Sequence, residues 1–261
     1  MFSALCSKTV PVAALRPWEI ERMLQLMRVC YDGIEPNRFS ADLQDKQYVI
    51  MLFARASGGL VGFSTLQLSD EVLEGRTVEV CFSGDTVIHP DYWGNKMLQV
   101  AFGRFVLWRK LRRPHRPCLW LLLTKGYKTY LLLVNNFPRS FPRRDTIPSL
   151  AYQEFLHRLA QARWPQAYDP TRGVVNFGGS RDRVKPDCAP IDAQTRENLH
   201  VAFFLQRNPD YGQGTELVCL AEMRIRDLLH GVARAGYAQS HLAFRRLRTN
   251  LTHWKYAGVR P

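Results

Sequence analysis

Hydrophobic residues in the first part of the chain follow a helical period and then a strand period. Residues 16–33 carry apolar side chains at intervals of three and four, which predicts a helix that ends near Gly33. Residues 48–56 and 60–68 are rich in β-forming residues, and a Ser-Gly-Gly turn separates them. This pattern predicts a β-hairpin.

A long strand, a helix and a buried strand follow. Residues 77–88 predict a strand, and Gly84 within it indicates a bulge or kink, because glycine inside a strand often marks one. Residues 96–112 have an apolar stripe that predicts an amphipathic helix, with Asn95 as its expected N-cap. Residues 118–123 are wholly apolar and predict a buried strand.

The second half of the chain predicts fewer regular elements. Residues 125–137 indicate a short helix, and residues 149–164 indicate an amphipathic one. Residues 200–206 and 216–223 predict two strands joined by a turn at 208–214. The chain beyond this last strand is basic and helical in pattern.

The composition narrows the class of protein. Of the 261 residues, 46% are hydrophobic and 23% are charged, which is typical of a globular chain that buries a core. No apolar run approaches the roughly 18 residues of a membrane-spanning helix, and the first residues lack a signal-peptide pattern. The six cysteines lack metal-site spacing and fit reduced thiols. We therefore expect a cytoplasmic protein without a bound metal.

The net charge of +13 is unevenly distributed, because residues 92–144 contain no aspartate or glutamate. Such a stretch attracts anionic partners, namely phosphates, an acidic carrier protein, RNA or an anionic membrane. The alternative is a solvated basic surface without a specific partner. The basic residues of the stretch are Lys96, Arg104, Arg109, Lys110, Arg112, Arg113, Arg116, Lys125, Lys128, Arg139, Arg143 and Arg144.

The turn before the helix carries a sequence signature. Ile88, Pro90, Tyr92 and Gly94 stand at spacings that resemble the turn of the GCN5-related N-acetyltransferase superfamily. The predicted order of helix, hairpin, kinked strand, turn, helix, strand and helix is similar to that family as well. The resemblance covers residues 15–137. It implies an α/β fold with a mixed, mostly antiparallel sheet flanked by helices.

The resemblance also implies a donor site. In that family the turn and the following helix N-terminus bind the pyrophosphate of coenzyme A, and the kinked strand offers its backbone to the acyl-pantetheine arm. This sequence departs from the pattern, because Trp93 replaces an arginine, and Lys96 and Leu98 replace glycines. Leu98 hinders a close approach of the phosphates, whereas Lys96 supplies a charge. The expected donor-binding residues are Ser83, Gly84, Trp93, Gly94, Asn95, Lys96, Met97 and Leu98.

The resemblance implies general acid and base groups for acyl transfer. Glu79, on the kinked strand, and Asp85, beside the bulge, are the candidate bases, and His89 is a third. An exposed strand face is the alternative explanation of Glu79. Tyr130 is the candidate acid for the leaving thiolate, and Tyr127 is a second choice. A core tyrosine with a satisfied hydroxyl is the alternative explanation of Tyr130.

Three functions remain open from the sequence. The first is an N-acyltransferase that moves an acyl group from acyl-coenzyme A or an acidic acyl-carrier protein to an amine, with no permanently bound cofactor. Its donor-binding core is expected at 1–137, and a C-terminal extension at 138–261 is expected to complete the acceptor side. The second is an aminoacyl-tRNA-dependent or RNA-binding protein, since aromatic residues interleave with the basic ones. The third is a non-catalytic interaction protein whose donor site has decayed.

Overall fold

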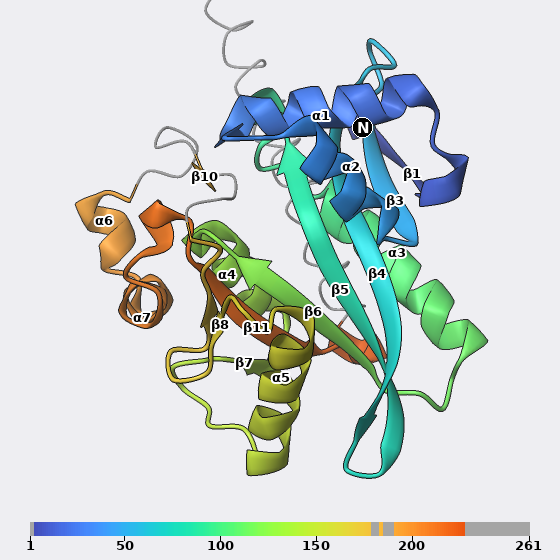
Figure 1. Ribbon diagram of the computed structural model, residues 1–261. Helices are drawn as coiled ribbons and strands as arrows, with labels where there is room; N and C mark the ends of the chain where they lie inside the picture. Colours follow the sequence, from blue (N-terminus) through green and yellow to red (C-terminus); the bar gives the residue numbers. More distant parts are fainter. Residues whose placement is uncertain (1–2, 179–182, 185–190, 228–261) are drawn as a thin grey trace, which may run out of the picture.

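The computed structural model describes residues 3–178, 183–184 and 191–227 (Figure 1). The predicted basic helix beyond residue 223 therefore lies mostly outside the described residues. One long, twisted sheet dominates the described part, and helices cover both of its faces. A separate two-stranded sheet joins β2, Tyr31–Asp32, to β10, Arg183–Val184.

The main sheet is mixed and mostly antiparallel, which confirms the predicted fold class. Every described pair of neighbouring strands is antiparallel except β5 with β6, which is parallel. A short strand, β7, Ser140–Phe141, pairs with β11 beside the main order. In spatial order the other strands are β1 (Leu5–Pro11), β3 (Tyr48–Ala54), β4 (Leu60–Leu73), β5 (Arg76–Ile88), β6 (Cys118–Thr124), β11 (Glu216–Glu222), β9 (Val174–Val175) and β8 (Tyr168–Asp169).

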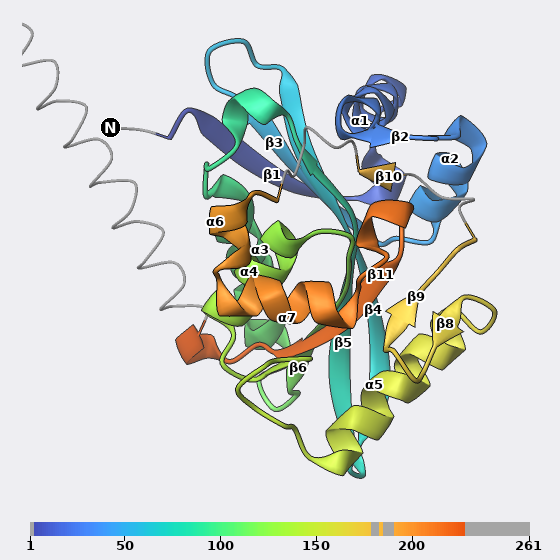
Figure 2. The same ribbon diagram turned by 90° about the vertical axis from the view of Figure 1, so that its left-hand side faces the viewer.

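The helices divide between the two faces of the sheet, as Figure 2 shows. One face packs against α3 (Met97–Arg112), α4 (Tyr127–Asn136) and α7 (Leu199–Arg207). The other face packs against α1 (Pro17–Cys30), α2 (Pro36–Gln44) and α5 (Leu150–Arg163). A short helix, α6, Ala193–Arg196, precedes α7.

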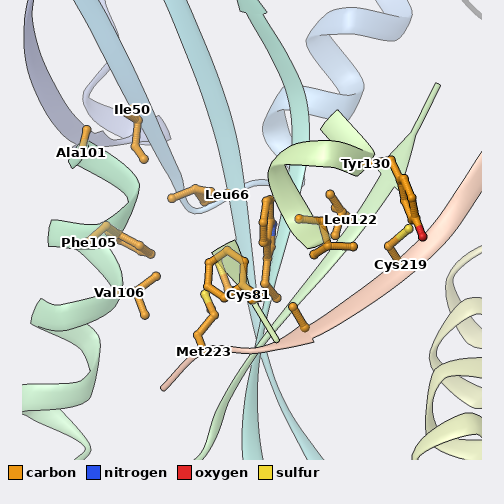
Figure 3. Close-up of a cluster of buried hydrophobic side chains, with 14 of the residues drawn as sticks. Ile50, Leu66, Cys81, Ala101, Phe105, Val106, Leu122, Tyr130, Cys219 and Met223 are labelled. Carbon is orange, nitrogen blue, oxygen red and sulfur yellow. The ribbon is translucent and has the colours of Figure 1, made fainter. Parts of the chain in front are cut away.

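Strand alternation explains this division, because successive side chains of a strand point to opposite faces. In β4, Phe63 packs with α1 and α2, whereas Leu66 packs on the α3 and α4 side. Figure 3 shows the hydrophobic cluster on the α3 and α4 side, to which Leu66, Cys81 and Leu122 of the strands and Phe105 of α3 belong.

The predicted bulge in β5 is present. Ser64 pairs with Thr86 and Leu66 pairs with Ser83, so β4 advances by two residues while β5 advances by three. The extra residue lies around Gly84. A Cβ atom on Gly84 would lie 2.6 Å from Thr65 Oγ1 and 2.9 Å from Lys46 Cε, so this close approach requires glycine.

The two parallel strands part at this bulge. The pairing of β5 with β6 extends from Glu79 with Cys118 to Ser83 with Leu122. Strand β5 then continues to Ile88 without further pairing to β6. Among the strands that the structure describes, the last part of β5 therefore pairs with β4 alone, and this opening lies directly before α3.

The prediction of a strand at 200–206 was wrong, because this segment is helix α7. Asn198 caps it through Oδ1, which accepts the His200 and Val201 amide N–H groups at 2.9 and 3.4 Å. Val201 and Phe204 lie on its buried face. The segment 208–214 accordingly connects a helix to a strand, and Gly214 at φ +92° ends it.

The sheet also crosses the predicted domain boundary at residue 137. Strand β11 pairs with β6 from Leu217 with Thr124 to Glu222 with Leu119. The parts 1–137 and 138–261 thus contribute strands to one sheet. The division into a core and an extension stays a prediction.

Gly84→Ala is expected to lower the free energy of unfolding by about 1–3 kcal/mol, the usual cost of overpacking. The same change should cost less in a Thr65→Ala background, because the atom at 2.6 Å is then absent. Urea unfolding of the two single variants and the double variant measures this coupling. Equal costs in both backgrounds would show that the hydroxyl does not restrict residue 84.

Candidate functional site

The turn between β5 and α3 lies beside the opening of the sheet. A 3-10 turn, Pro90–Tyr92, follows β5, and Gly94 has a φ of +82°. Helix α3 has Lys96 at the N-cap position, one residue after the predicted cap. Asn95 still contributes, because its Oδ1 accepts the Met97 amide N–H at 2.9 Å.

Trp93 connects the turn to β5 and to α4. Its Nε1 donates to the carbonyl oxygen of Ile88 at 2.8 Å, at the end of β5. The Lys128 ammonium, in the first turn of α4, lies 4.5 Å from the centroid of its indole ring. The side chain is nevertheless 42% exposed. The turn thus presents an aromatic ring and a lysine between the starts of α3 and α4.

The start of α3 is electrostatically suited to an anion. Its first amide N–H groups have no partner within the helix, and the helix dipole adds partial positive charge. The first turn contains no acidic residue, and the side chain of Lys96 is exposed. Met97 and Leu98 are half-buried and pack against the core. Among the predicted donor-binding residues, Lys96 therefore provides the positively charged side chain for a phosphate at this position.

Ser83 and Gly84 lie where the predicted acyl arm would pass. Ser83 is the last residue of β5 paired with β6, and its hydroxyl accepts the Trp120 indole N–H at 2.8 Å. Asp85 follows them and is half-buried. The structure therefore places these three residues and the turn at one end of β5.

Glu79 lies away from this end, in an ion-pair network. Its two carboxylate oxygens accept Arg109 Nε at 3.1 Å and Arg109 Nη2 at 2.5 Å, and Arg113 Nη1 lies 3.3 Å away. Its side chain is 4% exposed, so the exposed-face alternative is wrong. Arg113 and Arg116 also bind Asp70. These contacts favour a structural role for Glu79, whose catalytic role stays an untested prediction.

Tyr130 has the environment of a core residue. It is fully buried, and its hydroxyl donates to the carbonyl oxygen of Pro142 at 3.1 Å. Burial raises the pKa of Tyr130 well above its usual value. The centroid of its ring lies 6.2 Å from that of Phe203 and 5.7 Å from that of Phe204, both on α7. The hydroxyl proton is thus already bonded, which weakens the case for Tyr130 as the acid.

The second-choice residues, Tyr127 and His89, lie at the start of α4 and directly after β5. Tyr127 is the first residue of α4 and is half-buried. His89 follows β5, and its Nδ1 lies 3.4 Å from Asp91 Oδ2. No bond described for Tyr127 or His89 connects either residue to Glu79.

Two charged residues near the opening were not predicted as site residues from the sequence. Lys125 follows β6 and Glu216 begins β11, and the pairing of Leu217 with Thr124 places them side by side. Lys125 Nζ lies 3.7 Å from Glu216 Oε1, and the side chains are 14% and 8% exposed. The Lys125 ammonium also lies 5.3 Å from the ring centroid of Tyr31. Only the pairing of distant strands reveals this cluster.

The acid-free stretch is partly neutralised by acids from elsewhere in the fold. Its ion-paired members bind carboxylates on β4, β5, β11 and the loop after β7. They are Arg109, Arg113, Arg116, Lys125, Arg139 and Arg143. The stretch is therefore not a continuous free basic surface.

The described residues contain no group of three or more histidine, cysteine or acidic side chains placed to hold a metal ion. Within the same part of the chain, no helix is long and apolar enough to cross a membrane. Five cysteines there have free thiols, and Cys188 lies outside it.

No protein-family model matches the sequence, and no curated protein is similar to it in sequence. Solved structures are similar to about half of the chain. A probable N-acyltransferase from Enterococcus faecalis V583 is 14% identical with a TM-score of 0.37, over 49% of this chain and 31% of that chain. A Trypanosoma brucei acetyltransferase is 15% identical with a TM-score of 0.37, over 56% of this chain and 99% of that chain.

A third structure, the GNAT family N-acetyltransferase YhbS from Escherichia coli in complex with CoA, is 10% identical with a TM-score of 0.34. The match covers 48% of this chain and 65% of that chain. This third structure is named as a member of the superfamily whose turn the sequence resembles. At identities and TM-scores this low, the similarity assigns no activity, ligand or partner to this protein.

Glu79→Gln is expected to lower the free energy of unfolding by about 3 kcal/mol, because it leaves Arg109 without its buried carboxylate partner. Asp70→Asn is the matched control, since its exposed ion pairs should contribute less than about 1 kcal/mol. Urea denaturation of both variants provides the comparison. If Glu79→Gln is as stable as the control, the structural explanation of Glu79 fails.

Proposed function

We propose that the chain transfers an acyl group from a pantetheine thioester to an amine. One observation carries the proposal. The parallel strands β5 and β6 part at the Gly84 bulge, directly before a helix whose N-terminus bears an exposed lysine. An extended thioester arm fits beside an incompletely paired strand, and its phosphates fit the helix start.

The donor would be held by backbone and by charge. The part of β5 beyond Ser83 lacks β6 as a partner, so its backbone groups suit hydrogen bonds with the amides of a pantetheine arm. Lys96 and the first N–H groups of α3 would bind the phosphates. Both acyl-coenzyme A and an acyl-carrier protein provide such an arm.

Acyl transfer then requires a base and a proton for the leaving group. The amine nitrogen forms a bond to the thioester carbonyl carbon, the carbon–sulfur bond breaks, and the amine proton passes to a base. Among the candidate bases, Asp85 is favoured by its place on the opened part of β5, whereas Glu79 is held by two arginines. The Tyr130 hydroxyl donates to Pro142, which counts against Tyr130 as the acid, and Tyr127 at the start of α4 is the second candidate.

The binding of a donor is directly testable. Coenzyme A, acetyl-coenzyme A, a long-chain acyl-coenzyme A and tRNA are each added to the protein, and its melting temperature is measured at low and moderate salt. A ligand bound only by the folded state raises the stability. We expect a shift with a coenzyme A thioester that persists with salt. A shift with tRNA alone that disappears with salt would support the RNA-dependent function instead.

Lys96→Glu is expected to weaken coenzyme A binding about tenfold, because it reverses a charge that contacts phosphate. Its melting temperature should remain that of the wild type, since the side chain is exposed. Lys110→Glu reverses a charge in the last turn of the same helix and should leave binding unchanged. Titration calorimetry measures all three proteins. Equal affinity in Lys96→Glu would remove the turn from the donor site.

A further inference from the structure

The pair of Lys125 and Glu216 is unusual because Glu216 is buried and Lys125 is mostly removed from solvent, with side-chain exposures of 8% and 14%. Ionised side chains pay a desolvation cost of several kcal/mol in a protein interior, and apolar residues of similar size often replace such a pair without loss of stability. Lys125 Nζ and Glu216 Oε1 lie 3.7 Å apart. Stability alone is therefore a weak explanation for the pair. Buried charges of this kind are candidates for a functional site.

The pair lies on the face of the sheet opposite to the donor helix. Val218 and Leu220 alternate with the neighbouring residues of β11 and pack against α5, so Glu216 shares their face. Tyr31, which contacts Lys125, follows α1 and packs with the α1 and α2 cluster. The turn and α3 lie on the other side of the sheet (Figure 2).

The pair is also close to the opening along the chain. Leu122 is the last residue of β6 paired with β5, and Lys125 follows three residues later, past the point where the strands part. A donor arm that enters from the α3 side and passes through the opening would present its thioester towards this second face. A group that binds the acceptor is needed there.

We propose that Lys125 and Glu216 bind a zwitterionic α-amino acid as the acyl acceptor, an inference that rests on the proposed function. Such an acceptor carries an ammonium and a carboxylate on one carbon atom. Its ammonium would contact the Glu216 carboxylate, and its carboxylate would contact the Lys125 ammonium. The two adjacent, opposite charges in a desolvated position match this ligand class. The ring of Tyr31 would lie beside the acceptor.

Glu216 then has a role in the reaction. It takes one proton from the bound ammonium, and the freed amine nitrogen attacks the thioester carbonyl. The carbon–nitrogen bond forms and the carbon–sulfur bond breaks. The nitrogen passes its second proton to Asp85, the base of the proposed function, and the leaving thiolate receives a proton from Tyr127. Lys125 keeps the carboxylate of the acceptor in place throughout.

Matched acceptors test the carboxylate requirement. Thiol release from acetyl- and octanoyl-coenzyme A is followed with phenylalanine against phenethylamine, and with leucine against isopentylamine. Each pair differs only in the carboxylate. We expect kcat/KM to favour the amino acids on the order of 100-fold, the size of the loss when one partner of a buried charge pair is removed.

Variants of Lys125 and Glu216 then test whether this pair causes the preference for amino acids. Lys125→Met should abolish the preference by lowering kcat/KM for the amino acids, while the value for the decarboxylated amines stays the same. Glu216→Gln should lower the values for both classes. The affinity of each variant for coenzyme A and its melting temperature, measured in parallel, establish that it remains folded and binds the donor.

The possible results distinguish failure of the amino acid assignment from failure of the proposed acyl transfer. Amine-dependent thiol release without preference for the amino acids, or an equal loss for both classes in Lys125→Met, overturns the amino acid assignment alone. Failure of the wild type to bind coenzyme A thioesters, or to release thiol with any of the four acceptors, counts against acyl transfer from coenzyme A thioesters and overturns the amino acid assignment with it.

Discussion

The short parallel pairing of β5 with β6 is the constraint on which the rest of the site depends. It holds the two strands together from Glu79 to Ser83 and then ends. Because the bulge at Gly84 adds one residue to β5 opposite β4, the strand changes course while it stays bonded on its other side. The start of α3, the half-buried Asp85 and the Lys125–Glu216 pair all take their positions from this point.

The ion-pair network keeps the donor helix in place at its other end. Arg109 and Arg113 lie in and after the last turn of α3, where cations also suit the helix dipole. Their partners, Glu79 and Asp70, lie on β5 and β4. The same arginines that suggest an external anionic partner in the sequence are thus bonded within the fold. This reduces the charge available for RNA and leaves Lys96 at the opposite end of α3 for a small anion.

Sequence reasoning worked where the signals are local. The hairpin, the glycine bulge and the helix before β6 all follow from residues close together in the chain, and the structure contains them. It failed at 200–206, because a short apolar segment fits a strand or a helix equally, and the cap at Asn198 decides for a helix. It also did not predict that Lys125 and Glu216 lie together, since their proximity depends on the pairing of β11 with β6, which are far apart in the sequence. The burial of Glu79 depends on distant arginines in the same way.

Strand β11 is synthesised long after β6, its neighbour in the sheet, and this order affects the folding of the nascent chain. Strand β6 is complete once residue 124 has been synthesised, but its antiparallel neighbour ends only at Glu222. Until then, one edge of a strongly apolar strand has no partner and is open to pairing with other chains. Closing this long loop also slows folding, because distant segments must meet before the contact is formed. The long segment between β6 and β11 thus leaves the nascent chain prone to aggregation while it is being synthesised.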